Sequence, residues 1–134
     1  MSVQRENFEV LIAWLDALRR RDLDAVRELF APEVVWRGVP AGAVCENRDE
    51  VLDMLEEQLD EGLVTPDALE LVTGDSAIVL GVRSPALQEI GEVPLAGQLF
   101  NVFAVRERRI VAVQDYAERA DALRAAGASE PGWA

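Results

Sequence analysis

Carboxylates are the side chains of this sequence best suited to acid–base chemistry near neutral pH. The chain has no histidine, and all 13 of its basic residues are arginine. This composition excludes Ser-His-Asp and Cys-His catalysis, histidine-ligated zinc or iron, Schiff-base chemistry and Walker-type phosphate binding. Acid–base work therefore falls to aspartate and glutamate, with Tyr116 and Cys45 as the other titratable candidates.

Asp115 is the best candidate for a general base. It follows Val111 and Val113 at two-residue spacing in a predicted strand, so these three side chains share one face. The opposite face then carries Ile110, Ala112, Gln114 and Tyr116. A charged carboxylate among valines is costly to bury, so its pKa should rise and a hydrogen-bond partner should be present. The alternative is a structural aspartate near a strand end that binds backbone amides or an arginine.

Further residues are predicted to contact a ligand beside Asp115, and they are Trp14, Trp36, Gly38, Arg83, Asn101 and Val113. Asn101 either orients a ligand carbonyl or pairs with Asp115, because a buried asparagine needs hydrogen bonds. Arg83 is either a counter-ion for the pocket or an exposed charge at a strand end. Trp14 and Trp36 are either pocket walls or ordinary core residues. Gly38 is expected to leave space for a ligand beside Trp36.

Charge and hydropathy restrict the partners and the compartment. The formal net charge is −12 and the isoelectric point is about 4.3, so nucleic acids and anionic membranes are unfavourable partners. The apolar runs are far shorter than the roughly 20 residues of a membrane helix, and the N-terminus lacks the features of a signal peptide. We expect a cytoplasmic protein without a metal or cofactor, whose partner is a small apolar molecule.

Three helices are predicted in the first half of the chain. Apolar residues recur at helical spacing from Phe8 to Leu18, and Asp22 caps a second helix that runs through Phe30 and stops at Pro32. A short strand follows at 33–37, and then a loop at 38–46. Asn47 and Glu50 form a capping box that opens the third helix, whose acidic face we interpret as solvated.

The second half changes to the two-residue period of strands. Strands are predicted at 68–73 and 76–83 around a two-residue turn at Gly74-Asp75, then at 95–106 and 109–117. A closing helix at 118–126 is capped by Gly127. Helices ahead of an antiparallel sheet predict an α+β fold in which the N-terminal helix covers one sheet face, with a pocket between them.

The stretches RRRDLDAVRELFAPEVVW, NRDEVLDML and RIVAVQDYAERADALRAAG resemble the nuclear transport factor 2-like superfamily. That superfamily includes SnoaL-like polyketide cyclases, ketosteroid isomerases and limonene-epoxide hydrolases. The resemblance implies a cone-like, curled antiparallel or mixed sheet wrapped around the N-terminal helices. It implies one domain at 1–127 followed by a tail at 128–134, and a homodimer formed through a sheet face that no helix covers.

The limonene-epoxide hydrolase pattern transfers in part. Asp115 matches the water-activating aspartate of that family, whereas Trp36 stands in place of a tyrosine and Gly38 in place of an asparagine. Arg83 matches an arginine, but Pro85 replaces the acid that follows it. The resemblance to polyketide cyclases implies a single acid/base aspartate in an apolar pocket, a part that Asp115 fits.

Steroid isomerisation is rejected because Gly38 stands where that family has its proton-shuttling aspartate. Three hypotheses remain open. The chain is a cofactor-free hydrolase or cyclase that uses Asp115, a binding module without catalysis, or an assembly module whose pocket is ordinary core.

Overall fold

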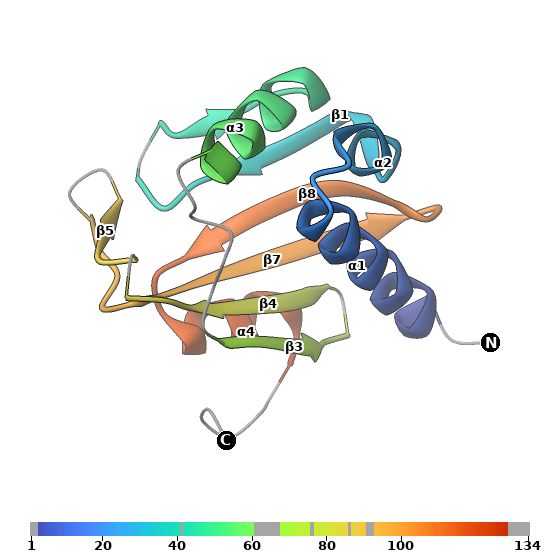
Figure 1. Cartoon of the computed structure of the whole chain (residues 1–134). Helices are drawn as coiled ribbons and strands as arrows, with labels where there is room; N and C mark the ends of the chain where they lie inside the picture. Colours follow the sequence, from blue (N-terminus) through green and yellow to red (C-terminus); the bar gives the residue numbers. More distant parts are fainter. Residues whose placement is uncertain are drawn as a thin grey trace.

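The computed structural model describes residues 3–40, 42–60, 68–75, 77–85, 87–90 and 93–128 (Figure 1). The elements are α1 (Val3–Arg19), α2 (Leu23–Glu28), β1 (Phe30–Arg37), β2 (Val44–Cys45), α3 (Arg48–Asp60), β3 (Ala68–Thr73), β4 (Ile78–Arg83), β5 (Glu89–Ile90), β6 (Val93–Pro94), β7 (Gln98–Arg106), β8 (Arg109–Tyr116) and α4 (Arg119–Ala126). A mixed sheet has the order β2-β1-β8-β7-β4-β3, in which β1 and β8 are parallel and the other neighbours antiparallel. The predicted α+β class is confirmed.

One face of the sheet carries α1, α2 and α3, as Figure 1 shows. The main core lies between these helices and the sheet. Leu11, Trp14 and Leu18 of α1 pack there against Phe103 and other sheet residues, as their helical spacing predicts. The inner face of the sheet is therefore where helices and strands can enclose a pocket.

The second helix is shorter than the sequence predicts. The Asp22 side chain accepts a hydrogen bond from the Ala25 amide, which confirms the predicted N-cap, but α2 ends at Glu28 and Phe30 begins β1. Pro32 therefore lies inside a strand. The strand tolerates it because the pairing of β1 with β8 is irregular between Phe30 and Val35.

The capping box of α3 is present with a changed partner. The Asn47 carbonyl Oδ1 accepts from the Glu50 amide at 2.9 Å, while Glu50 Oε1 accepts from the Glu46 amide at 2.7 Å. The acidic face of α3 is exposed, as expected. No cluster of three potential metal-binding side chains occurs among the described residues. The predicted loop at 38–46 contains β2, which pairs with β1.

The connection between β3 and β4 is longer than the predicted two-residue turn. Thr73 pairs with Ile78, and the Gly74 amide donates to the Ala77 carbonyl at 2.9 Å. The start of the predicted strand at Ser76 lies outside the described residues. The connection packs on the end of α4, because a Cβ on Gly74 would lie 2.2 Å from the Ala126 carbonyl oxygen. Tertiary contact, which the local pattern does not record, thus determines this turn.

The strand predicted from residue 95 begins at Gln98, because Ala96 and Gly97 have positive φ angles of 53° and 79°. The preceding segment, predicted as a loop, contains the small β5–β6 hairpin.

A β-bulge in β8 changes the predicted alternation of its side chains. Ala104 pairs with Ala112 and Val105 with Ile110, so Val111 is an extra residue without a partner in the ladder. Ile110 consequently joins Val113 in the main core, whereas strict alternation predicts that it lies on the opposite face. Asp115 lies beyond the bulge and keeps the predicted relation to Val113.

The other face of the sheet is partly covered by α4, which lies behind β4 and β3 in Figure 1. A second apolar cluster joins α4 to β4 and β7, and Tyr116 packs against it. Arg119 of α4 also forms a paired contact with the Glu70 carboxylate of β3, at 2.7 and 3.0 Å. The position of α4 corrects the expectation that no helix covers the outer face of the sheet. The homodimer expected through that face stays a prediction. None of the described helices is long and apolar enough to cross a membrane.

Candidate functional site

A cavity of about 550 Å³ opens between α1, α3 and the inner face of the sheet. Its wall is mainly apolar. Leucines from α1, α3, β4 and β7 line much of its apolar part, namely Leu15, Leu18, Leu55, Leu59, Leu80 and Leu99. A cavity of this size and lining suits a drug-sized apolar ligand.

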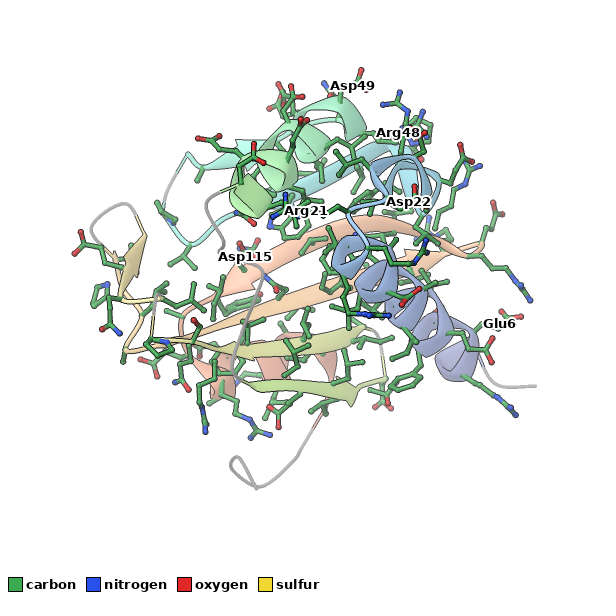
Figure 2. All side chains as sticks on the ribbon, in the orientation of Figure 1. Glu6, Arg21, Asp22, Arg48, Asp49 and Asp115 are labelled. Carbon is green, nitrogen blue, oxygen red and sulfur yellow. The ribbon has the colours of Figure 1, made fainter. Side chains whose placement is uncertain are left out.

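Asp115 lines this cavity from the end of β8, where Figure 2 labels it. Two donors bind the same carboxylate oxygen. Trp36 Nε1 donates to Oδ1 at 3.0 Å, and Asn101 Nδ2 donates to Oδ1 at 2.5 Å. No described residue donates a hydrogen bond to Oδ2. The side chain is thus fixed at one oxygen and has the other available for a substrate or a proton.

Burial determines the acidity of Asp115. Loss of water around the carboxyl raises its pKa to about 6, and the hydrogen bonds from Trp36 and Asn101 lower it and offset part of this effect. No arginine contributes to the shift. The carboxyl consequently titrates close to neutrality, where a base is both ionised and reasonably strong.

Strand pairing explains how these three residues meet. Asn101 of β7 lies directly opposite Asp115 in the antiparallel β7–β8 ladder, so their side chains project from the same face. Trp36 arrives from β1 on the other side of β8, where it pairs with Val113. Its indole therefore reaches forward along β8 to the carboxylate from a strand almost 80 residues away in sequence.

An aromatic cluster fixes the Trp36 ring. Trp36 lies 5.8 Å from Phe103 and 6.2 Å from Trp14 between ring centroids, and Phe30 completes the group. Both tryptophans are buried and both line the cavity. They differ in one respect, since the Trp14 indole N–H has no acceptor whereas the Trp36 indole N–H is bound to Asp115.

The structure brings together Trp14, Trp36, Asn101 and Asp115 of the predicted site residues. Trp14 and Trp36 each pack in the core and also line the cavity, so both roles considered for them, core residue and pocket wall, are present. Asn101 pairs with Asp115, which was one of its two expected roles. The Trp36 indole acts as a donor at the position where the resemblance implied a tyrosine hydroxyl.

The other three predicted contacts, Gly38, Arg83 and Val113, lie outside the cavity lining. Val113 is packed in the core with 2% exposure. The space expected beside Gly38 is filled, because a Cβ there would lie 3.1 Å from the Ala43 Cβ. Arg83 is exposed at the end of β4, as one of its two alternatives stated.

Polar residues that the sequence did not reveal also line the cavity, and they are Asp16, Arg19, Arg21 and Gln58. Helical spacing is the signal that places three of them there, because Asp16 and Arg19 follow Ile12 and Leu15 by one turn, and Gln58 lies between Leu55 and Leu59. The arginines Arg19 and Arg20 hydrogen-bond to Asp16 at 2.6 and 3.0 Å, and they lower its pKa. Asp16 is therefore an ionised partner of arginines.

Cys45 has no part in this chemistry. Its thiol lies 3.9 Å from the Met54 sulfur, and burial raises its pKa, so the thiolate is disfavoured.

The curled mixed sheet, the helices on its inner face and the buried carboxylate between them define a nuclear transport factor 2-like protein. The family model of the SnoaL-like domain matches residues 11–113, and the chain belongs to this SnoaL-like family. No curated protein sequence matches the chain.

Several solved structures share the fold. Bal32a, from a soil-derived mobile gene cassette, aligns with a TM-score of 0.65 and 16% identity, over 84% of this chain and 88% of its own. IdmH from Streptomyces antibioticus, a proposed polyketide cyclase, aligns with a TM-score of 0.61 and 19% identity, over 82% and 90%. An NTF2-like protein of unknown function from Burkholderia pseudomallei gives 0.59 and 20%, over 96% and 100%. At these identities the likeness establishes the fold.

Proposed function

We propose that the protein binds a small apolar molecule in this cavity and that Asp115 acts on it as a general base, without a cofactor. The carboxylate of Asp115 carries the proposal, because Trp36 and Asn101 hold one oxygen and leave the other for a substrate. Its pKa of about 6 means that most molecules hold an ionised Asp115 at neutral pH. The resulting base is stronger than an ordinary aspartate in water.

The lining favours proton abstraction beside a carbonyl group over epoxide opening. Opening an epoxide calls for an acid that protonates the leaving oxygen. The second carboxylate of the cavity, Asp16, is held ionised by two arginines and is a poor proton donor. Proton abstraction from carbon requires one base, which can return the proton later. IdmH, which shares the fold, is a proposed polyketide cyclase.

Deuterium exchange tests this proposal directly. The native protein and Asp115→Asn are incubated in D₂O near neutral pD with 2-tetralone, an apolar ketone with acidic α-hydrogens, and α-deuteration is followed by NMR. We expect exchange above background with the native protein and a loss of at least about 100-fold in Asp115→Asn. Asparagine keeps the shape of the side chain and a carbonyl oxygen for both donors, so the cavity should be preserved.

Asp16→Asn is the matched control, because it neutralises the other carboxylate of the cavity and should leave exchange intact. Diol formation from styrene oxide is measured in parallel. Diol that depends on Asp115, without ketone exchange, would replace the carbon-acid proposal with an epoxide hydrolase. Ligand binding without either reaction would identify a binding module. This is the second candidate, because the described residues place no further acid beside Asp115.

A further inference from the structure

We propose that Arg21 binds an oxygen acceptor of the ligand at the cavity wall, so that the ligand is an apolar molecule carrying a ketone or carboxylate group. This inference rests on the proposed binding of a small apolar molecule in the cavity. It identifies the class of ligand and a specificity-determining residue that lies outside the Asp115 hydrogen-bond group.

The backbone at Arg21 is the first observation. Helix α1 ends in a Schellman motif, in which the Asp22 amide donates to the Ala17 carbonyl and the Arg21 amide to the Leu18 carbonyl. Arg21 takes the left-handed position of this motif, with φ of 56°. Glycine is the usual residue there because it has no Cβ to strain. An arginine at this position carries a local conformational cost that a glycine would avoid.

The contacts of the guanidinium are the second observation. Arg21 Nη2 donates to the Leu59 carbonyl at the end of α3 at 3.0 Å. Its Nη1 lies 3.7 Å from Asp60 Oδ1, an ion pair too long for a hydrogen bond. One bond therefore orients the group, and its remaining N–H donors make no hydrogen bond to the described residues. Figure 2 shows Arg21 reaching toward the end of α3.

Charge within the cavity singles out Arg21. The other cavity-lining arginine, Arg19, donates to Asp16 at 2.6 Å and is engaged in that close pair. Asp115 repels an anionic group when it is ionised and has no arginine beside it. The Arg21 guanidinium, by contrast, offsets the charge of the nearby Asp60, so a ligand carboxylate is better placed at Arg21. Gln58 also lines the cavity and makes no hydrogen bond to the described residues, so its amide offers a neutral donor to the same group.

Matched ligands with one skeleton test the assignment. The probes are 2-ethylnaphthalene, 2-acetylnaphthalene and 2-naphthoate, and the dissociation constants come from isothermal titration calorimetry. We expect the native protein to bind at least one of the oxygen-bearing probes about fivefold or more tighter than the hydrocarbon, as one charge-assisted hydrogen bond provides. In Arg21→Gly the ratio of the hydrocarbon dissociation constant to that of the oxygen-bearing probe should fall to near one. The affinity for the hydrocarbon itself should change by less than about twofold.

Arg21→Gly suits the test because glycine is the residue that the backbone of this position favours. Circular dichroism confirms that the variant is folded. Arg27→Ala is the control, since Arg27 pairs with Asp49 and both residues lie outside the cavity lining. Arg21→Lys should restore part of the ratio.

Three outcomes would overturn the assignment. They are equal binding of all probes by the native protein, an unchanged ratio in Arg21→Gly, and an equal fall in Arg27→Ala, which would reduce the effect to net charge. A native protein that binds none of the probes would instead overturn the proposed cavity function, and this inference with it.

Discussion

The difference in unfolding free energy between the Asp115→Asn variant and the native chain should shift in favour of the variant as the pH rises. Burial raises the pKa of Asp115 to about 6 in the folded protein, whereas an aspartate in an unfolded chain titrates near about 3.9. The folded state therefore binds this proton more tightly. Its contribution to the free energy of unfolding is fully present below about pH 4 and is lost as the pH rises through about 6.

The magnitude follows from the difference of about two pH units between the two pKa values. It corresponds to about 3 kcal/mol in the free energy of unfolding, of which about 2 kcal/mol falls between about pH 4.5 and about pH 7. The asparagine side chain of the Asp115→Asn variant carries no charge at any of these pH values and retains an oxygen for Trp36 and Asn101.

Urea denaturation of both proteins across this range provides the measurement. The difference between the variant and the native chain isolates Asp115, because the other carboxylates of this acidic protein titrate in both. Unfolding free energies that run parallel from about pH 4.5 to about pH 7 would refute the reasoning, since they would mean that Asp115 is not desolvated. A difference that changes in the opposite direction would indicate a carboxylate stabilised in its charged form.

Two further predictions concern the aromatic cluster and the outer face of the sheet. Trp36→Phe should raise the pKa of Asp115 above 6, because a hydrogen bond to the carboxylate is lost, whereas Trp14→Phe removes an indole N–H without an acceptor and should leave that pKa unchanged. Carboxyl ¹³C NMR titration checks both, and equal shifts would show that packing alone controls the acidity. Gly74→Ala should lower the free energy of unfolding by about 2 kcal/mol or more, since the added Cβ would lie 2.2 Å from the Ala126 carbonyl oxygen. Urea denaturation measures this loss, and an unchanged stability would mean that α4 is not packed there.

Elements with strong local patterns were predictable from the sequence. The helical period placed α1, and side-chain caps marked the starts of α2 and α3 at Asp22 and Asn47. The two-residue period placed β8 and pointed to Asp115. These features depend on neighbours within a few residues, so a single sequence records them.

Boundaries and turns that depend on distant contacts were not predictable. Phe30 has the spacing of a helical residue, but pairing with Ile110 of β8 places it in a strand. Gly74-Asp75 has the form of a tight hairpin turn, but packing against α4 sets a longer connection.

The candidate site divides in the same way. The sequence by itself determined that any general base must be a carboxylate, because histidine and lysine are absent, and it identified Asp115 by its apolar strand. Only the tertiary structure decided that Trp36 and Asn101 both bind Oδ1, and that Arg21 lines the same cavity. Residue types and short spacings set which chemistry is available, whereas the donors around a buried carboxylate come from strands and helices that only folding brings together.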